Sequence, residues 1–263
     1  MNAVTTERHL FSPDPSKETQ HWLERVDKTA SVVLEHREQA ERDRVTPRPV
    51  FEALREAGLP RMWVSREFGG EQVPIETGVE ALQALARLDG SAGWQMSVQG
   101  AVGRMSDYLP EDTARLMFRD HSGLVIGGIN PAGGRAEETE GGFTLSGEWA
   151  FASGCAFADW FVCAALVTDG GEIRRTAAGP DMRMLFVPRS EVELLDTWYT
   201  TGLRGTGSTH FRVTGAHVPH AFTVRMADMY GVPPERASRR TPWSPSGRWS
   251  PRRRRSAARA PWP

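Results

Sequence analysis

The sequence has 263 residues, of which 39% are hydrophobic and 25% are charged, and its formal net charge is −1. This length is enough for one large domain or two smaller ones with a sizeable core, and no apolar run is long enough to cross a bilayer. Residues 1–20 lack the apolar core of a secretory signal, so we expect a cytoplasmic protein without membrane contact.

The chain opens with a region of helical character. Ser16 is predicted to cap a helix that runs to about Asp43 with an intermittent apolar face. A shorter amphipathic helix is predicted within 49–60, where Gly58 provides the stop signal.

Two further apolar-periodic stretches occupy 75–105, and 110–120 opens with Pro-Glu-Asp, a favourable helix start. We therefore assign residues 1–121 to an N-terminal helical domain.

The pattern changes to strands after residue 121, and we assign 122–230 to a middle β domain. Strands at these spacings are typical of an antiparallel sheet or barrel, which makes the fold class α+β. The predicted strands are 123–130, 143–153, 159–167, 182–188, 192–198 and 209–219. The glycine-rich connection between the first two is interpreted as turns.

Residues 231–263 differ from the rest in composition, with nine arginines against one acid, Glu235. This Arg/Pro-rich tail has no periodicity and cannot build a core, so it is expected to be disordered. The whole chain has thirty arginines but only two lysines, a bias that suggests GC-rich coding DNA. Our hypothesis is that the tail is a frameshift or truncation. Nucleic-acid binding through it is the alternative, but without a folded scaffold we expect no nucleic-acid partner.

Several short motifs carry little chemistry when taken alone. The glycine-rich 127–134 does not fit the dinucleotide fingerprint, and 202–208 lacks the Lys-Ser/Thr ending of a P-loop. The two cysteines, Cys155 and Cys163, are not spaced as a metal site, so we expect reduced, semi-buried thiols and no metal.

The stretch 147–167 raises a sharper question. Trp149 and Phe151 point the same way in an extended chain, and Ser153 and Gly154 then interrupt the strand. The break either serves packing or receives a flat ligand.

Four segments together resemble the acyl-CoA dehydrogenase superfamily, and within it the two-component flavin-dependent monooxygenases. They are 54–70, 85–94, 129–160 and 197–219, in the family's order, within a resemblance that spans 35–222. Two departures from the dehydrogenase pattern favour the monooxygenases. "INPAGGRAEE" replaces the Thr-Glu-Pro and Gly-Ser-Asp segments, and Phe-Ala-Ser replaces Trp-x-Thr.

The resemblance implies a flavin site, for FMN or FAD. Phe151 would pack on the isoalloxazine ring and Ser153 would hydrogen-bond near N5 or O4. Asn130 and Trp198 would approach the same ring, and Trp94 would line the substrate side. The alternative for the three aromatic residues is a role in the core.

The implied activity is that of a reduced-flavin monooxygenase, which hydroxylates an aromatic or polyketide-like small molecule through a C4a-(hydro)peroxyflavin. A separate flavin reductase would supply the flavin, and the intact enzyme would be a homotetramer. The alternative enzyme is an acyl-CoA dehydrogenase, which uses FAD for α,β-desaturation of a thioester. Arg204, Thr206 and Ser208 would either hold a phosphate or stabilise a turn.

The family continues with a C-terminal four-helix bundle, which completes the flavin pocket and the tetramer and supplies the catalytic base. Here the Arg-rich tail stands at that point, so the resemblance identifies no catalytic residue. The second alternative is therefore an inactive, truncated flavin-binding fragment.

Overall fold

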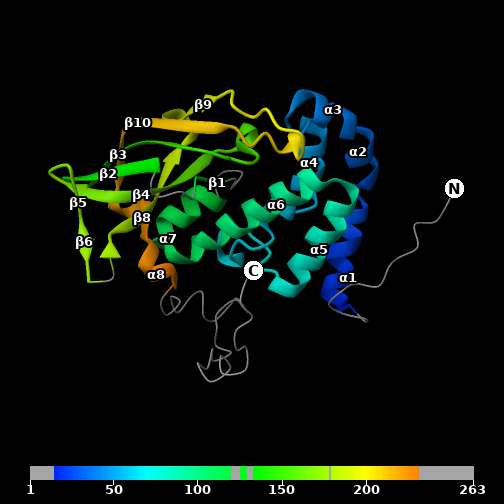
Figure 1. Cartoon of the computed structure of the whole chain (residues 1–263). Helices are drawn as coiled ribbons and strands as arrows, with labels where there is room; N and C mark the ends of the chain where they lie inside the picture. The colour runs from blue at the N-terminus through cyan, green and yellow to red at the C-terminus, as the bar shows by residue number, and fades with distance from the viewer. Residues whose placement is uncertain (1–14, 120–124, 129–132, 178, 231–263) are drawn as a thin grey trace, which may run out of the picture.

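Helices come first and strands follow in the computed structural model, which describes residues 15–119, 125–128, 133–177 and 179–230. Figure 1 shows the first helices gathered at one end of the molecule and the sheet at the other, with α6 and α7 reaching toward the sheet. This arrangement confirms the α+β fold class. Asn130 and the tail lie outside the described residues.

The region predicted as one helix up to Asp43 consists of three. They are α1 (Lys17–Asp27), α2 (Ala30–Glu35) and α3 (Arg37–Asp43). Ser16 caps α1 as predicted, and its hydroxyl accepts a hydrogen bond from the Thr19 amide at 3.1 Å. The prediction of a continuous helix was wrong. The amide and the hydroxyl of Thr29 both donate to the Val26 carbonyl three residues back, and His36 leaves the helical conformation with φ −102° and ψ 7°.

The remaining helices of this half follow the predicted pattern. They are α4 (Arg48–Glu56), α5 (Ile75–Leu88), α6 (Gly90–Gly103) and α7 (Glu111–Ala114). Gly58 follows α4 at φ +76°, a left-handed conformation that suits glycine. Asp89 caps α6 by accepting a hydrogen bond from the Ala92 amide at 2.8 Å. Within the described part of the chain, no helix combines the length and apolar character that a membrane span requires.

The sheet is mixed. Its path is β11-β8-β4-β2-β3-β10-β9, and β1 and β5 also pair with β4. Most pairs are antiparallel as expected, but β1 and β2 both run parallel to β4. The main strands are β1 (Val125–Gly128), β2 (Gly134–Thr139), β3 (Gly142–Trp149), β4 (Trp160–Asp169), β5 (Glu172–Ile173), β8 (Met182–Pro188), β9 (Glu193–Leu195), β10 (His210–Pro219) and β11 (Thr223–Arg225), and the short α8 (Met226–Tyr230) follows. A separate small hairpin joins β6 (Arg175–Thr176) and β7 (Gly179–Pro180).

The connection between the predicted strands 123–130 and 143–153 was interpreted as turns, but it contains strand β2, so that interpretation was wrong. Its glycines and charged residues resemble a loop, but β2 pairs with β3 over six residues and with β4 over three. Tertiary pairing therefore overrides local propensity here.

Strand β4 is buried on both faces, as its continuous apolar run predicts. Phe161 and Cys163 belong to a core that includes Trp149 and Phe211. Val162 and Ala164 belong to a second cluster, in which sheet residues pack against helical residues such as Phe118. The helical part of the chain has a further cluster of buried residues around α1, α4 and α5, and the second cluster joins helical residues to the sheet.

Trp149 anchors the end of β3 and provides a test of this core. Trp149 is almost fully buried, and its ring stacks on that of Phe211 with the ring centroids 5.2 Å apart. Its indole N–H donates a hydrogen bond to the Ala164 carbonyl at 2.8 Å. Trp149→Ala is expected to lower the free energy of unfolding by about 3–5 kcal/mol in urea titrations. Leu34→Ala on exposed α2 is the control, expected to change it by less than about 0.5 kcal/mol. Equal effects of the two substitutions would contradict this account of the core.

Candidate functional site

The bend between β3 and β4 is held by main-chain hydrogen bonds to the segment before β10. The Ala152 amide donates to the Thr209 carbonyl at 2.9 Å, and the Gly154 amide donates to the Thr206 carbonyl at 2.8 Å. Phe151 adopts φ +66°, a left-handed conformation that is uncommon for a bulky residue. Phe151 is 65% exposed, although its neighbours in the chain are buried or half-buried.

Two other rings lie nearly perpendicular to the Phe151 ring. The ring centroid of Phe151 lies 6.2 Å from that of Trp198 and 5.8 Å from that of His210, and both contacts are T-shaped. The Trp198 indole is fixed because its N–H donates to the Arg204 carbonyl at 3.0 Å. Phe151 is thus in contact with two nearly perpendicular rings and remains largely exposed to solvent.

Ser153 lies beneath the surface beside this aromatic group. It is 3% exposed, and its hydroxyl accepts a hydrogen bond from the Trp94 indole N–H at 3.1 Å. Trp94 comes from α6 and is 51% exposed. The structure therefore brings together Trp94, Phe151, Ser153 and Trp198, four of the five residues that the sequence assigns to a site.

The Ser153 hydroxyl also begins a buried chain of hydroxyls. Its oxygen lies 2.7 Å from that of Ser208, which lies 2.5 Å from that of Thr206. The Thr206 hydroxyl donates to the Leu203 carbonyl at 2.9 Å. Because Arg204 donates to the main-chain carbonyls of Glu41 and Thr200, this segment supports the interpretation as a stabilised turn over that as a phosphate cradle.

Two buried amides of α6 lie behind the bend. Gln95 accepts a hydrogen bond from the Thr46 hydroxyl at 3.0 Å, but its Nε2 has no partner among the described residues, and neither does the amide of Gln99. A Cβ on Gly154 would lie 2.6 Å from Gln95 Nε2. Gly154 is therefore required here by its φ of +82° and by the approach of α6. The four-residue spacing of the glutamines places them on one helix face, a signal that the sequence analysis missed.

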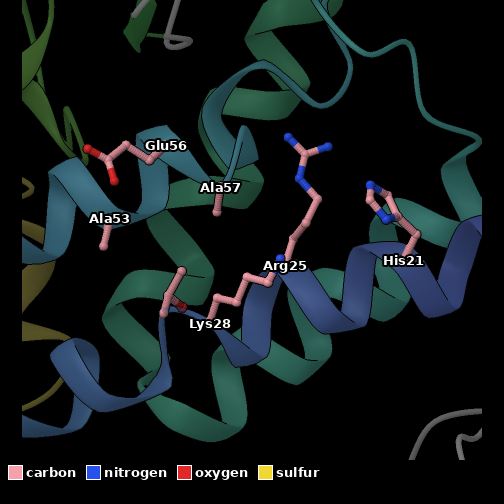
Figure 2. A pocket seen from close by; sticks show the side chains of 7 residues that line it. His21, Arg25, Lys28, Ala53, Glu56 and Ala57 are labelled. Carbon is pink, nitrogen blue, oxygen red and sulfur yellow. The ribbon is translucent and has the colours of Figure 1, made fainter.

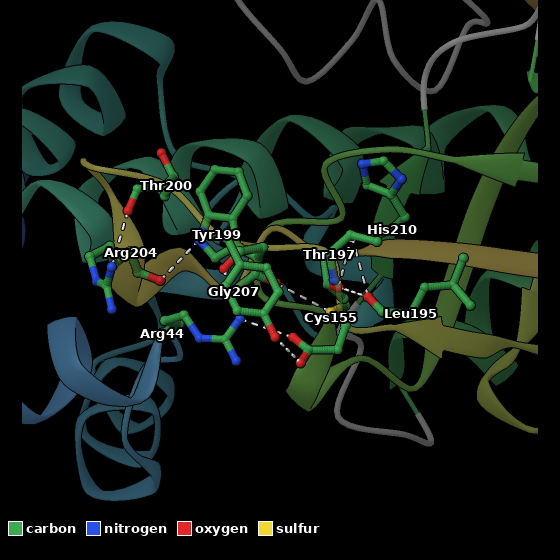
Figure 3. Close-up of polar contacts among 12 residues, drawn as sticks. Arg44, Cys155, Leu195, Thr197, Tyr199, Thr200, Arg204, Gly207 and His210 are labelled. Atoms are coloured by element: carbon green, nitrogen blue, oxygen red, sulfur yellow. Dashed lines mark hydrogen bonds and ion pairs between the residues drawn. The ribbon is translucent and has the colours of Figure 1, made fainter.

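A polar clamp fixes the segment that carries Trp198 (Figure 3). Arg44 donates to Asp196 at 2.9 Å and to the Trp198 carbonyl at 2.9 Å, and its guanidinium lies 4.0 Å from the centroid of the Tyr199 ring. Hydrogen bonds from Arg44 and Tyr199 lower the pKa of Asp196. No sequence signal could find this clamp, because Arg44 and Asp196 are 152 positions apart.

Two open depressions flank the bend. One, of about 330 Å³, lies over α5 and α6 and is lined by Trp94 and Leu203, and the other, of about 280 Å³, is lined by Arg44, Cys155 and Trp198. Both adjoin residues of the candidate site.

A depression of about 410 Å³ lies elsewhere, between α1 and α4 (Figure 2). Its lining includes His21, Arg25 and Lys28, together with the acidic Glu56. Arg25 already pairs with Glu71 at 3.3 Å and stacks over a tryptophan ring. This depression shares no lining residue with the bend, so we do not assign it to the same site.

Both cysteines are free, as the sequence predicts, but they are fully buried where semi-buried thiols were expected. Burial raises the pKa of the Cys155 thiol to about 11, and the Cys155 Sγ–H donates to the Gly207 carbonyl at 3.4 Å. No group of three His, Cys, Asp or Glu residues in the described ranges is arranged to hold a metal ion.

Comparison with known proteins identifies relatives over most of the chain. Residues 16–108 match the family described as "Acyl-CoA dehydrogenase, N-terminal domain". The FADH(2)-dependent resorcinol hydroxylase oxygenase component of a Rhizobium species is 30% identical over 211 residues, which are 80% of this chain and 50% of that protein. The HsaA oxygenase subunit of Rhodococcus jostii is 27% identical, over 75% of this chain and 50% of that protein. The chain spans about half the length of the curated relatives it matches.

Solved structures of other proteins have a similar fold. The 3-HSA hydroxylase of a Rhodococcus species has a TM-score of 0.76 at 25% identity, over 84% of this chain and 57% of that chain. XiaF of a Streptomyces species, solved with FADH2 and glycerol, has a TM-score of 0.72 at 25% identity, over 79% of this chain and 51% of that chain.

The conformation of Phe151 can be tested by two substitutions that both remove the ring. Phe151→Gly is expected to be more stable than Phe151→Ala by about 1 kcal/mol, because glycine tolerates positive φ. Urea denaturation measures the difference. Equal stability of the two variants would contradict the left-handed conformation.

The raised pKa of Cys155 predicts an unreactive thiol. With Cys163→Ala in place, alkylation of the folded protein by iodoacetamide at pH 8 is expected to be at least about a hundredfold slower than that of free cysteine. The rate should rise with pH up to about 11, where the thiolate forms. Unfolding in urea should abolish the protection, whereas rapid alkylation in the folded state would contradict it.

Proposed function

Because residues 16–108 match the acyl-CoA dehydrogenase N-terminal domain family and the chain is similar in sequence and fold to flavin-dependent oxygenase components, we propose that this chain forms the flavin-facing part of a reduced-flavin monooxygenase. The carrying observation is the bend, where an exposed, strained aromatic residue lies beside a buried, hydrogen-bonded hydroxyl. Strained backbone at a surface is a feature of ligand-binding sites.

The residues present fit a flavin. Phe151 offers an exposed aromatic side chain for a planar ring, and the Trp198 ring lies nearly perpendicular to it. Ser153 would hydrogen-bond the polar rim of the ring. Asn130 remains a proposed contact outside the described residues, and Trp94, which lines the adjacent depression, would face the substrate.

Bound reduced flavin would supply the activation of dioxygen and the transfer of one oxygen atom. The protein would bind and orient the ring, and Phe151 and Trp198 would exclude water from one of its faces. The substrate we propose is an aromatic or polyketide-like small molecule, and the reduced flavin, FMN or FAD, would come from a separate reductase. Two similar proteins support the proposal, because one is named a resorcinol hydroxylase oxygenase component and the other the HsaA oxygenase subunit of a flavin-dependent monooxygenase. The whole enzyme would be a cytoplasmic tetramer.

Flavin binding provides the first test. Anaerobic titration of the protein with reduced and oxidised FMN and FAD should show binding, and Phe151→Ala should weaken it roughly tenfold through loss of the stacked ring. Ile173→Ala removes an exposed apolar side chain on β5, outside the bend, and should leave affinity unchanged. Equal losses in both variants, or no binding by the wild type, would contradict the site.

The type of reaction is tested separately. Reduced flavin, air and a phenolic substrate should yield a product heavier by one oxygen atom. Anaerobic bleaching of oxidised flavin by an acyl-CoA, without any oxygenated product, would instead support the dehydrogenase. Flavin binding without either reaction would support the non-catalytic alternative.

A further inference from the structure

Four consecutive hydrogen bonds run through the hydroxyls behind the bend. They join the Trp94 indole N–H, the hydroxyls of Ser153, Ser208 and Thr206, and the Leu203 carbonyl, at 3.1, 2.7, 2.5 and 2.9 Å in turn. All three hydroxyl residues are buried. Water therefore does not compete for these bonds.

The two ends of this chain decide its direction. An indole N–H only donates and a carbonyl oxygen only accepts, whereas each hydroxyl donates one hydrogen and accepts through its lone pairs. All four bonds form together in one arrangement only: Trp94 donates to Ser153, Ser153 to Ser208, Ser208 to Thr206, and Thr206 to Leu203. In this arrangement the Ser153 hydrogen is used, and its oxygen keeps one lone pair without a partner among the described residues.

The opposite direction is available but has one hydrogen bond fewer. If Thr206 donates to Ser208 and Ser208 to Ser153, the Ser153 hydrogen points outward and the bond from Thr206 to the Leu203 carbonyl is lost. That carbonyl still accepts from the Thr206 amide at 3.1 Å, so reversal leaves no buried acceptor without a partner. The cost of reversal is one hydrogen bond, which corresponds to about fivefold in an equilibrium constant.

We propose that Thr206 and Ser208 are positioning residues that present the Ser153 oxygen as a hydrogen-bond acceptor and thereby favour a reduced over an oxidised flavin. This rests on the proposed function, with Ser153 placed at N5 and not at O4 of the flavin ring. N5 of a reduced flavin carries a hydrogen and donates, whereas N5 of an oxidised flavin only accepts. The reduced ring leaves all four internal bonds intact, while the oxidised ring requires the reversed arrangement.

The three hydroxyls of Ser153, Ser208 and Thr206 are called the relay below. Two variants that remove one of these hydroxyls test it. The measured quantity is the ratio of dissociation constants for oxidised and reduced FMN, from anaerobic titrations of the full chain. Thr206→Val removes the donor to Leu203 and the acceptor for Ser208, so the forward arrangement loses its advantage and the ratio should fall by about fivefold. Ser208→Ala should lower it similarly, which keeps the test available if either variant folds poorly.

Two controls separate the relay from packing. Thr206→Ser keeps the hydroxyl and should restore the ratio. Thr77→Val removes a buried hydroxyl on α5 that bonds Thr19 at 2.8 Å, and should leave the ratio unchanged. A purely structural role of Thr206 would weaken both flavin forms alike.

The outcomes distinguish the two proposals. Binding of neither flavin form by the wild type would overturn the proposed function and this inference with it. Binding of both forms, with a ratio that is the same in wild type, Thr206→Val and Ser208→Ala, would overturn the relay while leaving the flavin site in place.

Discussion

The pinning of the β3–β4 bend by main-chain hydrogen bonds is the constraint on which the candidate site depends. Trp149 is fixed in the core on one side, and the Ala152 amide is bonded to the Thr209 carbonyl on the other. Phe151 must cross the short gap between them, and it does so with positive φ and an outward ring. The exposure of this large apolar side chain therefore follows from backbone geometry. A surface of this kind is informative because isolated strain is normally removed unless the surrounding structure maintains it.

Helix α6 connects this geometry to the helical half of the molecule. Its N-terminus is fixed by Asp89, and it then contributes Trp94 to Ser153 and Gln95 to Thr46. The same helix packs Met96 in the helical core and Val102 in the cluster shared with the sheet. The orientation of Ser153 is thus set by elements from both halves of the chain, and neither half alone would reproduce the site.

The sequence predicted the features that local chemistry determines. The Ser16 cap, the stop at Gly58 and the doubly buried β4 each follow from residues that are adjacent along the chain. The sequence prediction failed where contacts between distant residues determine the structure. Segment β2 is a strand because it pairs with β3 and β4. The Arg44–Asp196 clamp joins two positions that belong to no common sequence motif. For the site, the resemblance supplied Trp94, Phe151, Ser153 and Trp198, which the structure places together. The hydroxyl chain was invisible, because Thr206 and Ser208 resemble ordinary turn residues until their partners are known.

Neutral hydroxyls suit a site whose ligand changes its hydrogen-bonding character. A buried charge in place of Ser153 would require a charged partner and would fix one polarity permanently. The relay of Ser153, Ser208 and Thr206 can instead reverse all its donors together, and only the bond to Leu203 distinguishes the two directions. Because that difference is a single hydrogen bond, the preference it produces is modest and the ligand can still leave in either state. A protein that receives a cofactor in one redox state and releases it in another needs a discrimination of this size, since a much stronger one would hold the cofactor in place.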